Sequence, residues 1–354
     1  MAELPTQAHQ TVQAIYRLHE QREAATPPRG HLGASVIGHA CERFLWLSFR
    51  WAGREAFGGR LLRLFAYGHA LEGRLVEELR AIGIEVHDAD DAGRQWSVSD
   101  HGGHFGGSLD GAARGFEEAP AAWHVLEFKS SNTKLFAELQ AKGVREAKPQ
   151  HWAQMQVYMG LTGMERAFYL VENKDTSALY QERVHFDAVE FYRLRARALR
   201  VITAAEPPPR LSADPAWFAC KWCHFHAQCH GTDAPGVNCR TCAHSTPELD
   251  GDARWSCALH KRDIGGIGAQ LVGCEGHRYI PILLERIGEQ TGVADEAGGN
   301  VAVVYRTPAG ESFANGAPPS FSSLEIHAAR HKSELGSPDV QAVKKAWQKA
   351  RVVA

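Results

Sequence analysis

Two short stretches, GGSLDGA (residues 106–112) and VLEFKSS (residues 125–131), decide the fold that we expect for this chain. Both are predicted strands; Asp110 ends the first, and Glu127 and Lys129 occupy alternate positions of the second. Because side chains two apart on a strand share a face, Glu127 and Lys129 should point into one site while Phe128 points away. A neighbouring strand can bring Asp110 beside them. Clustered carboxylates are hard oxygen ligands suited to Mg²⁺ or Mn²⁺, so the pattern predicts a metal site.

Helices and further strands are predicted on both sides of these stretches. Apolar residues at helical spacing run from residue 60 to 82, in a helix that would carry Glu72, and also mark residues 6–24, 39–50 and 187–205. Pro149 and Gly163 would begin and end another helix. Short runs at residues 84–87, 95–99 and 104–113 predict strands of one sheet with residues 123–131, and strand character returns at 166–172 and 178–186. We therefore expect an α/β fold.

Four residue pairs on these elements match one nuclease pattern in chain order. The pattern is Gly with His or Glu four residues later on a helix, a G-x-x-D strand, an E-x-K strand and a helix with Q-x3-Y. The matching pairs are Gly68 and Glu72, Gly107 and Asp110, Glu127 and Lys129, and Gln154 and Tyr158. Over residues 35–232 the sequence thus resembles the RecB-like branch of the PD-(D/E)xK nucleases. That branch includes lambda-type and YqaJ-type viral exonucleases and CRISPR-associated RecB-like nucleases.

The resemblance implies a restriction-endonuclease-like core, with a mixed central sheet flanked by helices, that hydrolyses DNA with two metal ions. The implied ligands of Mg²⁺ or Mn²⁺ are three carboxylates and one carbonyl, those of Glu72, Asp110, Glu127 and Phe128. Lys129 would assist the attack, and Gln154 and Tyr158 would line the site beside substrate or metal-bound water. The chain departs from the motif in having Leu109 where its name has proline, and Glu72 replaces the histidine of many members.

Other interpretations of these residues stay open from the sequence. Asp110 could be an ordinary turn residue, with Glu127 and Lys129 on a solvated strand face. His69, one helical turn from Glu72, could take its place as a ligand, although the spacing favours Glu72. Gln156 points away from Gln154 and is expected to pack rather than to react. Four cations follow the site and could contact phosphates or simply face solvent: Lys134, Lys142, Arg145 and Lys148.

The eight cysteines fall into two sets, each with a C-x2-C spacing that favours metal ligation over disulfides in a reducing compartment. The first set is Cys41, Cys220, Cys223 and Cys229. RecB-like nucleases with an iron–sulfur cluster have one cysteine before and three after the nuclease motifs, and the resemblance extends to this order. Thiolate-only ligation suits a [4Fe–4S] cluster. The alternative is zinc with a histidine in place of Cys41, from among His224, His226 and His230.

The second set, Cys239, Cys242, Cys257 and Cys274, resembles a zinc ribbon or knuckle. Three histidines could substitute for a thiolate: His244, His260 and His277. The alternative is a set of reduced thiols without a ligand. This segment is rich in glycine and has little apolar material for a core of its own, so we favour Zn²⁺.

Composition limits the class of partner. The 354 residues carry a net charge of −2, so any DNA-binding surface must be local. No run of about 18 apolar residues could span a bilayer, and the polar N-terminus does not match a secretion signal, so we expect a cytoplasmic protein without a membrane partner. No G-x4-G-K-[ST] loop occurs, so unwinding would need a helicase on another chain. A single-strand annealing or recombination protein is a second candidate partner; the oligomeric state stays open.

These observations predict four regions and one leading function. The regions are an N-terminal helical segment (1–34), the nuclease domain closed by the iron–sulfur site (35–232), a zinc-ribbon-like segment (233–280) and a C-terminal region without an assigned role (281–354). In the last, residues 300–316 predict a hairpin, and Ser337 and Pro338 the start of a final helix. The leading function is an exonuclease or end-processing nuclease in recombination, repair or phage DNA metabolism. A CRISPR-adaptation nuclease and a non-catalytic DNA-binding protein are the alternatives.

Overall fold

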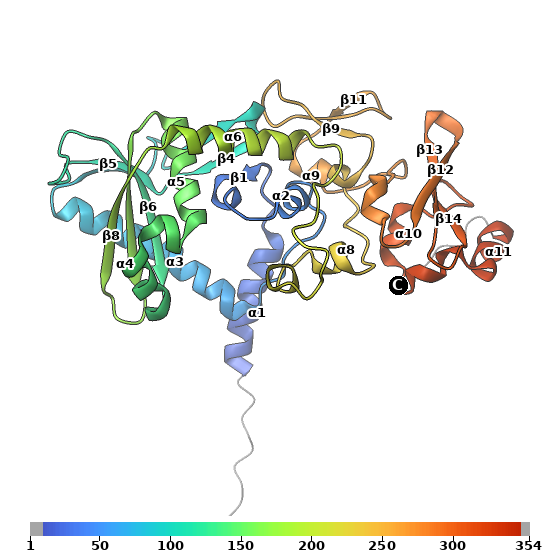
Figure 1. Ribbon diagram of the computed structural model, residues 1–354, viewed down its shortest axis with the longest axis horizontal. Coiled ribbons are helices and arrows are strands. Elements are labelled where there is room, and N and C mark those ends of the chain that lie inside the picture. The colour runs from blue at the N-terminus through green and yellow to red at the C-terminus, as the bar shows by residue number, and fades with distance from the viewer. Residues whose placement is uncertain (1–9, 348–354) are drawn as a thin grey trace, which may run out of the picture.

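The computed structural model describes residues 10–347, and the sheet with most strands, which we call the central sheet, is a mixed five-stranded sheet at the left of Figure 1. The strand order is β2-β5-β6-β7-β8. The bounds are Glu85–His87 for β2, Gly111–Arg114 for β5, His124–Ser131 for β6, Arg166–Asn173 for β7 and Leu179–His185 for β8. β6 and β7 run parallel, whereas the other neighbours are antiparallel. The predicted α/β class with a mixed sheet is confirmed.

Helices cover both faces of this sheet because apolar side chains of its strands point alternately to one face and to the other. Leu126 and Phe128 of β6 pack with Leu71 and Leu75 of α3 (Gly59–Ala81) in one cluster. Val125, on the other face, belongs to the main core, which includes residues of α4 (Thr133–Ala147), α5 (Pro149–Thr162) and α6 (Ala188–Thr203). This alternation places β6 between α3 and α5, with Glu127 on the α5 side.

The predicted helix boundaries around the site are correct. Pro149 is in the first turn of α5, and Gly163 ends it in the left-handed conformation (φ 75°), with its N–H donating to the Met159 carbonyl at 2.9 Å. Asp187 caps α6 through the Glu190 N–H. α1 (Gln10–Ala25) and α2 (Glu42–Phe49) match the two predicted N-terminal helices, except that residues 6–9 of the first lie outside the described residues.

The expectation that three or four early strands form one sheet is correct for β2, β5 and β6 and wrong for the segments that form β3 and β4. β3 (Ser97–Asp100) and β4 (Phe105–Ser108) pair with β1 (Leu32–Gly33) in a separate three-stranded sheet. Only β2 and β5 join the central sheet. The chain changes sheets at Leu109 and Asp110, where the Leu109 N–H donates to the Trp96 carbonyl and the next residues turn toward β6. Strand propensity identified the segments, but tertiary pairing decided their sheets.

The C-terminal half forms two further three-stranded sheets. One contains β9 (Ser245–Pro247), β10 (Trp255–Cys257) and β11 (Arg262–Ile264), and the other contains β12 (Glu289–Asp295), β13 (Val301–Arg306) and β14 (Ser312–Asn315). The predicted hairpin is β13 and β14, and Ser337 caps α11 (Pro338–Ala346) with Pro338 in the first turn, as predicted. The remaining short helices are α7 (Phe218–Lys221), α8 (His226–His230), α9 (Ile267–Gln270) and α10 (Ser323–Ala328).

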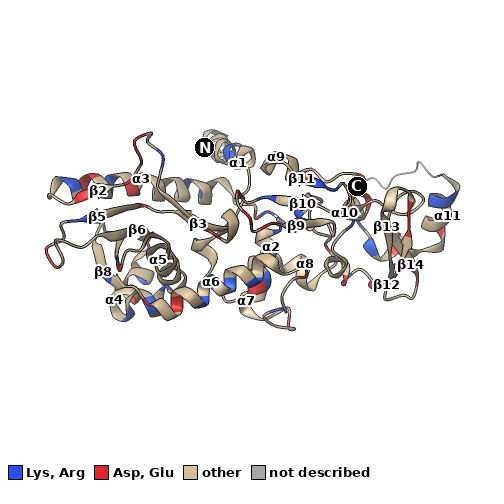
Figure 2. Cartoon of the chain, turned by 90° about the horizontal axis from the view of Figure 1, so that it is seen from above, with Lys and Arg blue, Asp and Glu red and all other residues tan. Residues whose placement is uncertain are grey.

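One core joins these parts. The main apolar cluster runs without a break from Leu32 in the N-terminal part, through α5 and α6, to Trp255, Tyr305 and Leu335 in the C-terminal half. Acidic and basic residues lie interspersed along the helices in Figure 2, in keeping with the net charge of −2. Among residues 10–347, no helix is both long and apolar enough to cross a bilayer.

Candidate active site

Strand β6 contributes the centre of the site. Glu127 is fully buried, and its carboxylate pairs with the ammonium of Lys129, two residues along the same strand face. The second carboxylate oxygen accepts a hydrogen bond from Gln154 Nε2 of α5 at 3.0 Å. The alternative that these two residues form a solvated strand face is therefore wrong for Glu127.

Asp110 lies at the turn where the chain leaves β4 for β5, and it faces β6. Its Oδ2 accepts a hydrogen bond from the Phe128 N–H at 2.7 Å, which fixes the carboxylate beside Glu127 and Lys129. The Phe128 carbonyl in turn accepts from Lys129 Nζ at 3.1 Å. The backbone of Phe128 therefore links Asp110 to Lys129, while its side chain packs on the α3 face.

Glu72 approaches from α3, on the other side of the sheet. Burial, followed by repulsion from the Asp110 carboxylate, raises the pKa of Glu72, and Lys129 acts against this shift. His69 Nδ1 lies 3.5 Å from a Glu72 oxygen, but the His69 side chain is 80% exposed against 30% for Glu72. Glu72 is the less exposed member of the pair, and the charges of both residues interact with the Asp110 carboxylate.

The electrostatics of the site are those of carboxylates crowded around one cation. Burial, with the Asp110 and Glu72 charges, raises the pKa of Glu127 to about 7 despite the nearby Lys129. Burial also raises the pKa of Asp110. Although burial alone would lower it, the three carboxylates raise the pKa of Lys129. Three acidic groups and one ammonium leave an excess of negative charge in a site that buries Glu127 completely but leaves the side chains of Glu72 and Lys129 30% and 29% exposed.

Helix α5 contributes Gln154 and Tyr158, four residues apart on one face. Gln154 Nε2 donates to Glu127 and lies 3.3 Å from the Tyr158 hydroxyl, so one amide bridges the two. A Cβ on Gly107 would lie 2.6 Å from that hydroxyl, which explains why this position requires glycine. Burial raises the pKa of Tyr158 to about 12, so the hydroxyl keeps its proton. All six predicted site residues therefore meet in one place.

The sequence did not reveal a buried glutamate beside the site and its two partners on α3. Glu172 of β7, only 2% exposed, pairs with Arg74 and accepts a hydrogen bond from the Tyr67 hydroxyl at 2.9 Å. Tyr67 and Arg74 flank Glu72 along α3, so this contact holds the helix that carries Glu72 against the sheet. An acidic residue in the apolar run RAFYLVE was the available signal.

A histidine at the start of α5 was also missed. His151 Nδ1 lies 2.7 Å from the Tyr169 hydroxyl. Burial, followed by the positive charges of Lys129 and Lys148, lowers the pKa of His151 to about 3, so the imidazole is neutral. His151 lies three residues before Gln154 on α5, so its contact with Tyr169 of β7 helps to hold that part of the helix against the sheet.

The other polar residues have mainly structural contacts. Gln156 is fully buried; it donates to the His185 carbonyl at 3.0 Å and accepts from the Asp187 N–H at 2.7 Å, so the prediction that it packs is confirmed. Lys142 pairs with two glutamates of its own helix, and the Arg145 guanidinium lies over the Trp152 ring at 4.4 Å. Lys134 is exposed and Lys148 partly exposed, which leaves both open to a phosphate.

The first cysteine set gathers around one small cavity of about 30 Å³. Cys41, Cys220, Cys223 and Cys229 all line it, although Cys41 is about 180 residues upstream of the others. The Cys41 sulfur also accepts from the Phe44 N–H at 3.4 Å at the start of α2. Of the candidate histidines, His224 contacts Glu55 at 3.4 Å and His226 contacts the Pro215 carbonyl at 3.1 Å. His226 and His230 line the same cavity as the four cysteines, so the structure brings Cys41 and two of the three candidate histidines to the later thiols.

The second set lines a cavity of about 310 Å³ formed with the β9–β11 sheet. Its members are Cys239, Cys242, Cys257 and Cys274. His260 Nε2 lies 3.4 Å from the Cys274 sulfur, whereas His244 bonds Asn300 at 2.9 Å and His277 bonds Ser323 at 2.8 Å. All eight cysteines of the chain are free thiols. Within residues 10–347, no group of three or more His, Cys, Asp or Glu side chains is preset to hold a metal ion.

Comparisons with known proteins found only distant structural likenesses. No protein-family model and no curated protein matches the sequence. An alkaline exonuclease (LHK-Exo) from Laribacter hongkongensis is 18% identical with a TM-score of 0.37, and the match covers 52% of this chain and 90% of the exonuclease. The structure of LHK-Exo in complex with dAMP is 18% identical with a TM-score of 0.36, and the match covers 53% of this chain and 89% of that one. The crystal structure of SSO0001 is 15% identical with a TM-score of 0.38, covering 62% and 95%. Likenesses this distant do not identify the function, which therefore depends on the site.

Proposed function

We propose that this protein is a metal-dependent deoxyribonuclease that hydrolyses phosphodiester bonds at the site formed by Glu72, Asp110, Glu127 and Lys129. The observation that carries the proposal is the convergence of three acidic side chains from α3, the β4–β5 turn and β6 on the Lys129 ammonium. A surface ion-pair network would not need to bury Glu127 completely. Perturbed acidic groups of this kind are typical of functional sites.

The donor set fits a hard divalent cation. Carboxylate oxygens and a backbone carbonyl are the ligands that Mg²⁺ and Mn²⁺ prefer, and the excess negative charge would be compensated by binding a cation. We assign Glu72, Asp110, Glu127 and the Phe128 carbonyl as ligands. When bound, such ions lower the pKa of water and stabilise the oxygens of a phosphate undergoing displacement.

The remaining residues would act on the nucleophile and the strand. Lys129, already held within the site by its contact with Glu127, would position the attacking water and offset charge that develops on the phosphate. Gln154 orients the Glu127 carboxylate through its amide and keeps the Tyr158 hydroxyl nearby. Because Tyr158 keeps its proton, it can donate a hydrogen bond to a phosphate oxygen.

The test is degradation of DNA by the purified full chain. We expect linear DNA to be degraded with Mn²⁺ or Mg²⁺, and E127Q and D110N to abolish this while E146Q, whose side chain is 70% exposed on α4, leaves it unchanged. Circular dichroism would show that the variants are folded. Failure of the wild type to degrade any end or strand type, linear or circular, would favour the non-catalytic DNA-binding protein.

The finer role follows from the sequence resemblance. We propose end-processing of DNA in recombination, repair or phage DNA metabolism, in the cytoplasm, with a helicase or a single-strand annealing protein as partner. A CRISPR-adaptation nuclease is the alternative, and the polarity of digestion together with association with integrase proteins would separate the two.

We also propose a [4Fe–4S] cluster at the first cysteine set and Zn²⁺ at the second. The first proposal is supported by the meeting of Cys41 with Cys220, Cys223 and Cys229 around one cavity, and the second by four thiols beside a small three-stranded sheet. Anaerobic purification should give iron and sulfide near four each, one zinc and a visible absorption band. A preparation with about two equivalents of zinc and no iron would refute the proposed cluster.

A further inference from the structure

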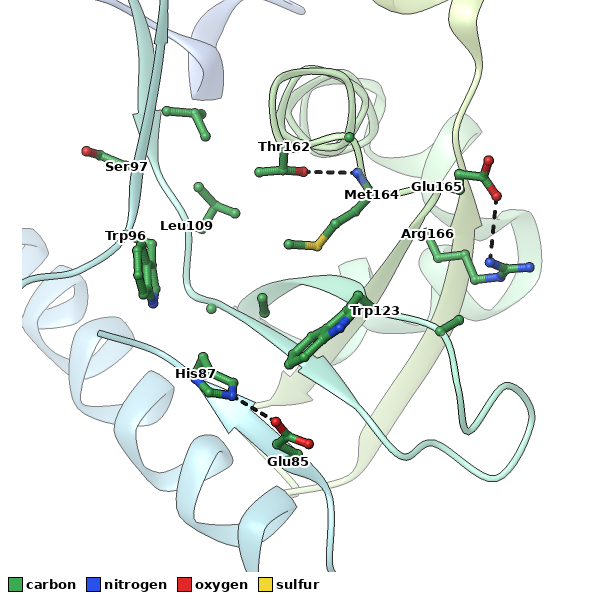
Figure 3. A pocket seen from close by; sticks show the side chains of 15 residues that line it. Glu85, His87, Trp96, Ser97, Leu109, Trp123, Thr162, Met164, Glu165 and Arg166 are labelled. Carbon is green, nitrogen blue, oxygen red and sulfur yellow. Dashed lines mark hydrogen bonds and ion pairs between the residues drawn. The ribbon is translucent and has the colours of Figure 1, made fainter. Parts of the chain in front are cut away.

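One cavity beside the proposed catalytic site contains no predicted catalytic residue. It has a volume of about 830 Å³ and lies among β2, β3, β5 and the end of α5. Figure 3 shows the indole rings of Trp96 and Trp123 on opposite sides of it, with Leu109 and Met164 beside them. Its size is that of a ligand site, and its walls are mainly apolar and aromatic.

The cavity and the carboxylate site share one turn of the chain. Leu109 and Gly111, which line the cavity, are the residues on either side of Asp110. The cavity also lies on the same face of the central sheet as Glu127: Ala112 pairs with Val125, and Val125 precedes Glu127 by two residues.

Two independent elements give the same separation between cavity and site. Trp123 is four residues before Glu127, which corresponds to about 13 Å along a strand. Thr162, another lining residue, is eight residues after Gln154, about 12 Å along a helix. A strand with its scissile phosphate at the carboxylates would therefore bring a neighbouring nucleotide to the cavity.

The charges in the cavity suit a neutral ring better than a phosphate. Glu85 bonds His87 Nε2 at 3.0 Å and Arg114 Nε at 2.6 Å, and Glu165 lies 4.0 Å from Arg166, so each carboxylate has a cationic or imidazole partner. The Arg114 guanidinium lies 5.0 Å from the centre of the Trp123 ring. Because these charges balance one another, the two indole rings are the groups in the cavity best suited to contact a ligand. Trp96 is 44% exposed.

We propose that this cavity binds an unpaired nucleobase of the substrate strand, stacked on Trp96 or Trp123. The proposal rests on the proposed nuclease function, since it makes single-stranded DNA, or a frayed or overhanging end, the preferred substrate. Nucleobases stack on aromatic side chains in single-strand binding sites, and any base has the necessary face.

Binding can be measured without hydrolysis, by fluorescence anisotropy of labelled oligonucleotides in EDTA. Stacking of one base contributes enough that W96A or W123A should weaken single-strand binding by roughly 5- to 150-fold. W96F and W123F should retain most of the affinity, and W347A, a tryptophan 71% exposed in the C-terminal region, should leave it unchanged. Unchanged thermal unfolding would show that the alanine variants are folded.

A scan with a single abasic nucleotide then locates the base. One position should lower wild-type affinity as much as the alanine variant with the larger loss, W96A or W123A, and the two changes together should cost no more than either alone, because they remove the same contact. Three outcomes would refute the proposed base-binding cavity. They are additive losses of affinity from the two changes, an affinity that no abasic position lowers, and full affinity in both alanine variants. If the wild type binds in this base-dependent manner but never hydrolyses DNA, the nuclease proposal is refuted while the proposal of a base-binding cavity still holds.

Discussion

Truncation of Arg240 should destabilise the whole protein, because this side chain holds the second cysteine segment against residues of the N-terminal part of the chain. It is 1% exposed and lies over the Trp51 ring at 3.6 Å. Its guanidinium donates to the Phe49 carbonyl at 3.0 Å, the Gly30 carbonyl at 2.9 Å and Gln270 Oε1 at 2.9 Å. Three segments far apart in the sequence therefore meet at one cation.

The expected magnitude follows from these contacts. R240A would leave three acceptors without their donor, at about 1 kcal/mol each, and the lost packing of the stem would add about 1–2 kcal/mol, for a total of about 4–5 kcal/mol. Burial, followed by repulsion from Arg50, lowers the pKa of Arg240 to about 9, which shows that holding the charge is itself unfavourable. R240M, which keeps the aliphatic volume and removes the charge, should therefore cost less than R240A.

Equilibrium urea unfolding, followed by the intrinsic fluorescence of the nine tryptophans, which include Trp51 and Trp255 beside this residue, would test the prediction. R240A should lower the midpoint of a single transition without changing its slope. A loss below about 1 kcal/mol would refute the account of the contacts. Two separate transitions in the wild type would show instead that the cysteine segment unfolds independently, in conflict with the continuous apolar core.

Three further predictions follow from the site. E127Q should lower DNA hydrolysis by more than about 100-fold in single-turnover assays, because a buried anionic ligand is lost while the shape is kept; activity within a few-fold of wild type would contradict its role. G107A should force the Tyr158 hydroxyl away from a Cβ at 2.6 Å and destabilise the protein by about 1–3 kcal/mol, measured by thermal unfolding, with G68A, at an open helical position, as the tolerated control. Because the pKa of His151 is lowered from 6.5 to about 3, the unfolded chain takes up a proton first, so stability falls as pH decreases through this window, by up to about 1.4 kcal/mol per unit. H151N should flatten that dependence in urea midpoints measured between pH 7 and 4, and an unchanged slope would refute the assignment.

The elements that carry the site could be predicted because their signals are local. The period of two along β6 fixed the shared direction of Glu127 and Lys129, and a proline and a glycine marked the two ends of α5. Gly107 was found through its motif, and the structure supplies its reason in the approach of the Tyr158 hydroxyl.

Long-range pairing could not be predicted in the same way. Nothing local in residues 95–108 distinguishes a partner for β1 from a partner for β6, because both environments accept the same strand pattern. The contact of Glu172 with Arg74 likewise depends on how α3 crosses the sheet, which is decided by the packing of whole elements. The apolar nature of Trp96 and Trp123 was visible in the sequence, but their meeting around one cavity was not.

The change of sheets at Leu109 and Asp110 accounts for both the catalytic proposal and the base pocket. Had β4 and β5 continued in one sheet, Asp110 would have sat within a paired strand; instead, the turn directs its carboxylate to the Phe128 N–H. The same turn separates β3 from β5 and leaves the space between Trp96 and Trp123. Because one bend in the chain creates both features, a mutation that straightens it should impair DNA hydrolysis and base-dependent binding together, whereas E127Q and W123A should separate them.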